Sequence, residues 1–166
     1  MSKFEYDERM RILGIDPGYE RLGIAVLEKQ KNGKEEVLFS ECFKTIASLP
    51  HSERLLLIGN EVERVAKLYN PESLAIETLF FNTNQKTAMK VSEARGTILY
   101  AAKKCGLSIH EFTPPEIKLA VSGYGKSDKL QMIKMVKLLV YVREDIKHDD
   151  EFDAIAAALA CFAIKC

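Results

Sequence analysis

An apolar run, Ile12–Ile15, leads directly into Asp16, and the turn residues Pro17-Gly18 follow at once. A short apolar run that ends at a turn signal is typical of a strand buried within a sheet. A carboxylate at the end of such a strand is costly to bury unless another group compensates its charge. Asp16 therefore predicts a polar site at the carboxyl end of this strand, although an acid at this position can also simply begin the turn.

The rest of the chain alternates between strand and helix patterns. Strands are predicted over residues 11–16, 22–28, 35–45, 73–80 and 107–112, and helices over residues 51–69, 84–105, 114–121, 127–142 and 151–165. Three strands followed by alternating helices and strands predict an α/β fold, with a mixed five-stranded sheet and helices on both faces. The length of 166 residues fits a single domain over 11–166, preceded by a flexible N-terminal extension over 1–10.

Two further acidic positions adjoin apolar segments. Glu77 lies inside the strand pattern LAIET, and a glutamate is rarely fully buried without a partner. Asp150 and Asp153 are three residues apart at the start of the Ala-rich terminal helix, so they share one face of it. Tight packing of that helix would bring both acids down onto the sheet. The alternative explanation of this pair is that acids favour a helix N-terminus through its dipole.

Clustered carboxylates at these three positions predict a site for divalent cations. Neighbouring carboxylates repel one another, and a cation among them relieves the repulsion. Oxygen ligands suit Mg²⁺ or Mn²⁺, and two such ions can activate water and stabilise the leaving oxygen in phosphodiester cleavage. The acidic positions together therefore favour a functional site that holds two metal ions over four unrelated structural acids.

The charges of the chain are balanced in number but unevenly distributed. Lys plus Arg and Asp plus Glu both number 24, yet residues 103–143 hold eight basic against three acidic residues, and residues 144–153 hold six acids against one Lys. A basic surface beside an acidic pocket is compatible with a polyanion bound through metal ions, and an ordinary solvated surface is the alternative. The four cysteines form no C-x-x-C pair, and none lies near a histidine in zinc-finger spacing, which favours reduced thiols in a cytoplasmic protein.

Three motifs of the chain resemble the RuvC family of bacterial Holliday-junction resolvases. They are ILGIDPGxxxxG from Ile12, AIETLFFNTNQKTAMKVSEARG from Ala75 and DxxDAIAAALA from Asp150, and the resemblance runs from Arg11 to Cys166. The first motif also resembles turns of actin-like kinases and Hsp70-type ATPases, but those proteins need two such lobes. The resemblance implies a ribonuclease-H-like fold, a homodimer, and metal-dependent, symmetric cutting of junction DNA in recombination and repair. By the same resemblance, the RuvA–RuvB branch-migration complex is a partner.

The resemblance also implies which acids perform the chemistry. Asp16, Glu77, Asp150 and Asp153 match the catalytic acids of the family, which are also its metal ligands. Asp149 is a rival to Asp150, but the spacing of three residues to Asp153 favours Asp150. Members of the family carry either Asp or His at that position.

Four residues match or adjoin positions that contact DNA in the family. Phe80 matches an aromatic residue that stacks on a junction base, with Phe81 as a rival and core packing as the alternative explanation. Lys118 and Lys129 match lysines that face the scissile phosphate, although a solvated helix surface also explains them. Lys126, close to Lys129 in the segment SGYGKSDK, is a further candidate for DNA binding.

Two other functions stay open on the sequence. A YqgF-type nuclease shares the opening motif and the fold but acts on RNA, and its second motif lacks an AIE followed by Phe, so residues 77–80 argue against it. A structure-specific DNA-binding protein that does not cleave is the alternative from another class. The presence of all four acids argues against that alternative.

Overall fold

The computed structural model describes residues 9–79 and 85–165. Its elements are, in chain order, β1 (Met10–Asp16), β2 (Arg21–Lys29), β3 (Glu35–Lys44), α1 (His51–Tyr69), β4 (Ser73–Glu77), α2 (Gln85–Lys104), β5 (Ser108–Phe112), α3 (Pro114–Ser122), α4 (Lys129–Leu139) and α5 (Asp149–Lys165). All ten elements predicted from the sequence occur, in the predicted order. Because residues 1–8 lie outside the described ranges, the flexible extension over 1–10 stays a prediction.

The ends of three elements differ from the prediction by two residues or more. β4 ends at Glu77, whereas the apolar pattern predicts a strand over 73–80. α4 begins two residues later than predicted because the Asp128 side chain accepts a hydrogen bond from the backbone N–H of Gln131 at 2.8 Å and caps the helix. α5 begins at Asp149, two residues earlier than predicted, so its first three residues, Asp149, Asp150 and Glu151, are all acidic.

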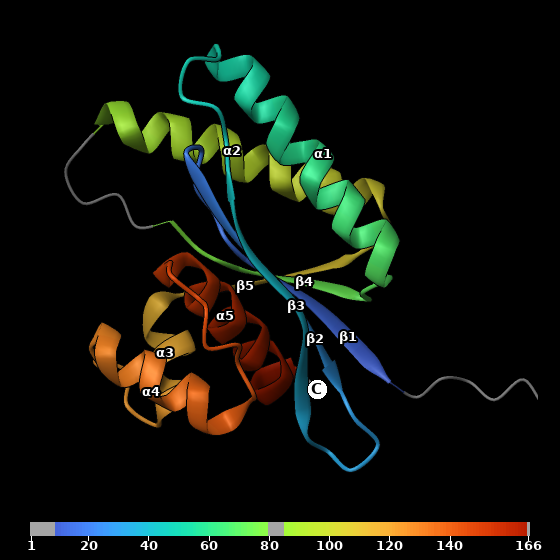
Figure 1. Cartoon of the computed structure of the whole chain (residues 1–166), viewed down its shortest axis with the longest axis vertical. Helices are drawn as coiled ribbons and strands as arrows, with labels where there is room; N and C mark the ends of the chain where they lie inside the picture. Colours follow the sequence, from blue (N-terminus) through green and yellow to red (C-terminus); the bar gives the residue numbers. More distant parts are fainter. Residues whose placement is uncertain (1–8, 80–84, 166) are drawn as a thin grey trace, which may run out of the picture.

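The five strands form one mixed sheet in the order β3-β2-β1-β4-β5. β1 pairs antiparallel with β2 and parallel with β4, and β4 pairs parallel with β5. In Figure 1, α1 and α2 cover one face of the sheet, whereas α3, α4 and α5 lie on the other. The predicted fold, a mixed five-stranded sheet with helices on both faces, is confirmed, and β1 lies at its centre.

β1 is buried on both faces, which explains its apolar run. Leu13 and Ile15 pack into the core beneath α1 and α2, whereas Ile12 packs into the core that the sheet forms with α3, α4 and α5. Because side chains alternate along a strand, Gly14 and Asp16 face the same side as Ile12. The burial of β1 therefore directs the Asp16 carboxylate towards α5.

α5 lies close to the sheet because two strand positions beneath it carry no side chain. A Cβ atom on Gly14 would lie 2.1 Å from the carbonyl oxygen of Ala154, and one on Gly23 would lie 1.9 Å from that of Asp150. Gly23 pairs with Asp16 across the β1–β2 ladder. The first turn of α5 therefore comes directly beside Asp16.

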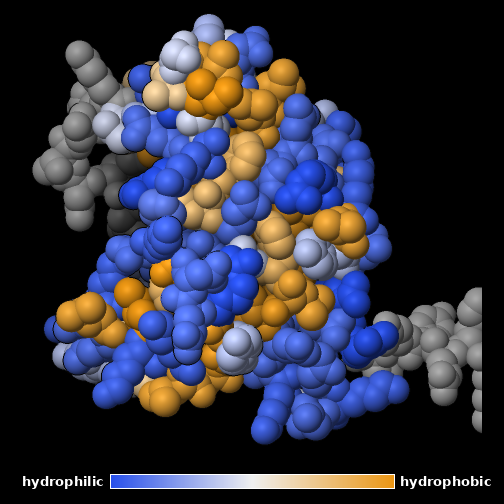
Figure 2. Space-filling model, in the orientation of Figure 1, coloured by the Kyte–Doolittle hydropathy of each residue, from blue (hydrophilic) through white to orange (hydrophobic). Residues whose placement is uncertain are grey.

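The outer side of the α3–α4 layer exposes apolar side chains. Figure 2 shows the hydrophobic colour over these helices at the lower left of the molecule. Leu119 of α3 and Leu130 and Leu138 of α4 are 58–80% exposed, whereas Met132 and Val136 of α4 are buried. α4 thus turns one apolar side inward and leaves another in solvent. Within residues 9–79 and 85–165, no helix combines the length and apolar character that crossing a membrane requires.

The contact between β1 and α5 predicts that Gly14→Ala destabilises the protein. The added methyl group overlaps the backbone of α5, and overpacking of this kind costs roughly 1–3 kcal/mol. Gly125→Ala is the matched control, because a Cβ there would lie no closer than 3.4 Å to any atom, which is an ordinary van der Waals contact. Urea unfolding followed by circular dichroism measures both variants. A Gly14→Ala protein as stable as the wild type would contradict the close contact.

Candidate active site

Asp16 lies where the end of β1 meets the first turn of α5. Burial is the main reason that its pKa is raised from 3.8 to about 8, and the carboxylates of Asp153, Asp150 and Glu77 raise this pKa further. Lys129 acts in the opposite direction. The structure therefore brings the four acids singled out in the sequence into one electrostatic group, which we name the acid cluster (Asp16, Glu77, Asp150 and Asp153).

Glu77 joins the acid cluster from the last residue of β4. β1 and β4 are parallel neighbours in register, so Asp16 and Glu77 lie at the same edge of the sheet. Arg95 of α2 donates a hydrogen bond to the backbone carbonyl of Glu77 at 3.3 Å, which fixes the end of the strand. Burial and the nearby Asp153 raise the pKa of Glu77, and Lys118 partly offsets this rise.

α5 supplies the other two acids, and each has a cation nearby. Lys129 Nζ lies 3.4 Å from Asp153 Oδ2 and 2.9 Å from Asp149 Oδ2. Arg21 Nε lies 3.5 Å from Asp150 Oδ2. The Asp150 side chain is only 16% exposed, whereas that of Asp149 is 56% exposed and turns to Lys129. This arrangement supports Asp150 rather than Asp149 as the fourth member of the acid cluster.

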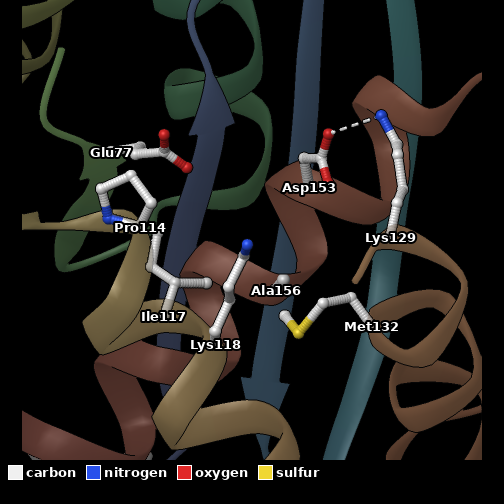
Figure 3. Close-up of a pocket in the computed structure, with 8 residues that line it drawn as sticks. All are labelled: Glu77, Pro114, Ile117, Lys118, Lys129, Met132, Asp153 and Ala156. Atoms are coloured by element: carbon white, nitrogen blue, oxygen red, sulfur yellow. Dashed lines mark hydrogen bonds and ion pairs between the residues drawn. The ribbon is translucent and has the colours of Figure 1, made fainter. Parts of the chain in front are cut away.

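A cavity of about 200 Å³ opens beside the acid cluster. Its lining residues are Glu77, Pro114, Ile117, Lys118, Lys129, Met132, Asp153 and Ala156. Figure 3 shows Lys118 pointing into the space between Glu77 and Asp153, while Lys129 approaches Asp153 from the side of α4. The two lysines that the family resemblance singles out thus share a cavity with two of the acids.

The other two candidate DNA contacts do not line this cavity. Lys126 is exposed in the segment that connects α3 to α4, so it lies on the surface rather than among the acids. Phe80, with its rival Phe81, lies outside the described residues. The base-stacking role of Phe80 therefore stays a prediction.

Two residues near the acid cluster are absent from the sequence-based prediction. Arg21 contacts Asp150 from the start of β2, and Cys42 of β3 donates a hydrogen bond from Sγ to Asp150 Oδ2 at 3.7 Å. Both residues are more than a hundred positions from Asp150 in sequence, and no spacing pattern marks them. Only the pairing of Gly23 with Cys42, together with the approach of α5 to Gly23, explains these contacts.

The donor atoms of the acid cluster fit a hard divalent cation. Its members offer only carboxylate oxygens, the donors that Mg²⁺ and Mn²⁺ prefer. The high pKa of Asp16 results first from burial and then from the neighbouring carboxylates, and Lys129 offsets only part of the rise. A divalent cation among these oxygens would favour the ionised carboxylates and relieve their repulsion.

Comparison with known proteins identifies the family. Residues 12–161 match the family described as "Crossover junction endodeoxyribonuclease RuvC". The chain belongs to the RuvC family. A RuvC protein of the same description from Desulfitobacterium hafniense is 45% identical over 150 residues, which cover 90% of each chain. One from Thermosipho melanesiensis is 44% identical over 156 residues, which cover 94% of this chain and 98% of the relative.

Solved RuvC structures share the fold of this chain. The structure of T. thermophilus RuvC in complex with Holliday junction substrate superposes with a TM-score of 0.86 at 32% identity, and the match covers 93% of each chain. A second Thermus thermophilus RuvC structure gives a TM-score of 0.84 at 33% identity, over 92% of this chain and 94% of the other. The expected family and its ribonuclease-H-like nuclease fold are confirmed, and RuvC membership implies dependence on a divalent metal.

The raised pKa of Asp16 predicts that the metal-free protein loses stability as the pH rises. Between pH 3.8 and about 8, the Asp16 carboxyl stays protonated in the folded protein but ionises in the unfolded chain. The folded state therefore binds more protons in this window, and stability falls with increasing pH. We expect Asp16→Asn to weaken this pH dependence and to raise the melting temperature at pH 8.

Thermal unfolding in EDTA across this pH range measures the effect. Asp145→Asn is the matched control, because the Asp145 side chain is 74% exposed and pairs only loosely with Arg143, at 3.4 Å. If the melting temperature of Asp16→Asn equals that of the wild type at every pH, the Asp16 carboxyl is not the source of the pH dependence.

Proposed function

We propose that this RuvC-family chain is a crossover junction endodeoxyribonuclease, which resolves four-way Holliday junctions by paired phosphodiester cleavage in recombination and DNA repair. The observation that carries the proposal is the convergence of four carboxylates from β1, β4 and α5 at one edge of the sheet. The match to the RuvC family over residues 12–161 gives this cluster its reaction. A T. thermophilus relative with the same fold binds Holliday junction substrate, which supports the same substrate here.

The acid cluster is the proposed metal site, with two Mg²⁺ ions that Mn²⁺ can replace. Asp16, Glu77, Asp150 and Asp153 would be the ligands. Bound in this way, the ions supply activation of water and stabilisation of the leaving oxygen. The role of the chain is to hold two carboxylates at strand ends and two on a closely packed helix, because small displacements of such groups lower the rate strongly.

Lys118 and Lys129 are proposed to face the scissile phosphate. Both line the cavity beside Glu77 and Asp153, where an ammonium group can stabilise the negative charge that develops on phosphate oxygens. Lys118 points into the cavity, whereas Lys129 would have to exchange its ion pairs with Asp149 and Asp153 for the phosphate. Exposed Lys126 is proposed to contact the DNA backbone away from the cleavage point, through an interaction that salt weakens. The stacking of Phe80 on a junction base is proposed from the family resemblance alone.

The exposed side of α2 supports a homodimer. Gly96 lies in the middle of this helix, and a Cβ there would meet no atom within 4 Å, so packing on its own sheet does not require a glycine. Met89 and Tyr100, one turn or two away, are 67% and 70% exposed. A second copy of the chain on this side would provide one acid cluster for each of two opposing junction strands, in keeping with the near two-fold symmetry of a four-way junction.

The family match also bears on the partners, the location and the two alternative functions. Partnership with RuvA–RuvB and a cytoplasmic location are proposed from family resemblance alone. A YqgF-type nuclease that acts on RNA is the less favoured alternative, because the match is to RuvC and Glu77 stands in the RuvC-like motif. A non-cleaving junction binder would not need four carboxylates whose proximity costs stability, which is the reason that we favour cleavage.

The proposal predicts that the loss of one acid abolishes cleavage but not junction binding. Glu77→Gln and Asp153→Asn each remove a proposed metal ligand, and we expect the rate of Mg²⁺-dependent cleavage of a four-way junction to fall by more than about 100-fold. Affinity for the junction should persist, because removing a negative charge lessens repulsion of the phosphates. Gel-based cleavage and mobility-shift assays on the same junction measure the two effects.

Asp145→Asn is the control for these variants, since it removes an exposed acid outside the acid cluster. A linear duplex of the same sequence is the control substrate and should stay intact. Substantial Mg²⁺-dependent cleavage by purified Glu77→Gln or Asp153→Asn would overturn the proposed metal site, and equal cutting of the linear duplex would overturn junction specificity.

A further inference from the structure

A second group of metal-ligating side chains adjoins the acid cluster. Cys42 of β3, His148 of the segment before α5 and Asp150 of α5 each offer one ligand atom, and these atoms all lie within 4.8 Å of one another. All three side chains are half-buried rather than fully exposed. The group therefore unites a sulfur, a nitrogen and an oxygen donor, from parts of the chain that are more than a hundred residues apart in sequence.

This donor set differs chemically from that of the acid cluster. Thiolate and imidazole ligands suit zinc-class cations, whereas Mg²⁺ is bound almost entirely through oxygen. Zinc requires ligand distances of about 2.0–2.3 Å, and atoms within 4.8 Å of one another reach a common ion by small side-chain rotations. Three protein ligands leave a fourth tetrahedral position for water, and coordination expels the thiol proton to solvent.

The backbone holds the three ligands in place. Cys42 pairs with Gly23 across the β2–β3 ladder, and Gly23 is the position at which the backbone of Asp150 makes its close approach to the sheet. The hydrogen bond from Cys42 Sγ to Asp150 Oδ2 already joins two of the ligands. The carbonyl oxygen of His148 accepts a hydrogen bond from the N–H of Glu151 at 3.3 Å, which ties the third ligand to the start of α5.

Arg21 is the positive group that competes with a cation for Asp150. Its Nε lies 3.5 Å from Asp150 Oδ2, which is a long ion pair, and its side chain is 54% exposed. An ion pair of this length, with one partner more than half exposed, contributes little. Arg21 can therefore turn into solvent when a cation binds.

We propose that Cys42, His148 and Asp150 form a second metal site, selective for a zinc-class cation, that shares Asp150 with the acid cluster. Occupancy of this site withdraws one carboxylate from the acid cluster, so it inhibits Mg²⁺-supported cleavage. The binding step stands independently of the proposed function, whereas the inhibition rests on it.

Cobalt absorption tests the binding step without any cleavage. The protein is first freed of metal and then supplied with excess Mg²⁺, which occupies oxygen-only sites. Co²⁺ is then titrated into this sample. We expect a thiolate-to-cobalt charge-transfer band in the wild type and in Cys105→Ser, the matched control at the half-buried thiol after α2, and no band in Cys42→Ser. His148→Ala should weaken Co²⁺ binding by about tenfold or more. A band that survives Cys42→Ser, or no band in the wild type, would overturn the site.

Zinc inhibition of junction cleavage tests the shared carboxylate. Each protein is compared with its own Mg²⁺-supported rate in the absence of Zn²⁺. On this scale, Cys42→Ser should need about tenfold more Zn²⁺ for half-inhibition than the wild type or Cys105→Ser. Equal sensitivity of Cys42→Ser and the wild type would overturn the competition for Asp150. A wild type that binds Co²⁺ through Cys42 but cleaves no junction would contradict the proposed function and leave the second metal site supported.

Discussion

The close packing of α5 on β1 and β2 is the contact on which the site depends. Gly14 and Gly23 carry no Cβ, and this gap lets the backbone carbonyls of Ala154 and Asp150 come against the strands. Side chains at either strand position would push α5 away and would carry two of the four carboxylates out of reach of Asp16. Tight core packing, which transmits small changes in volume, therefore sets the geometry of the acid cluster.

The acid cluster is held together against its own repulsion. Burial and three neighbouring carboxylates raise the pKa of Asp16 to about 8, and Lys129 offsets only part of this rise. A chain selected only for stability would not gather these groups, so the cost itself points to a function. The buried faces of β1 and α5 compensate for that cost, and the cavity with Lys118 and Lys129 gives a phosphate access to the acids.

The sequence predicted the fold well because buried strands and amphipathic helices have different periods. It also singled out the acid cluster, since an acid that ends an apolar strand or begins an Ala-rich helix is conspicuous. The start of α4 is predictable from the sequence, because Asp128 and Gln131 have the spacing of a capping box. The predicted start at residue 127 does not take that spacing into account. The proximity of Cys42 to His148 cannot be predicted from the sequence, since it arises from strand register and from the close approach of α5.

The most direct test of the central claim is to locate bound Mn²⁺ by anomalous X-ray scattering from crystals of the protein. The account predicts anomalous peaks within ligand distance of the carboxylate oxygens of Asp16, Glu77, Asp150 and Asp153, with the position of α5 unchanged. Mn²⁺ bound only elsewhere on the molecule, with the acid cluster in contact with protein groups alone, would contradict it.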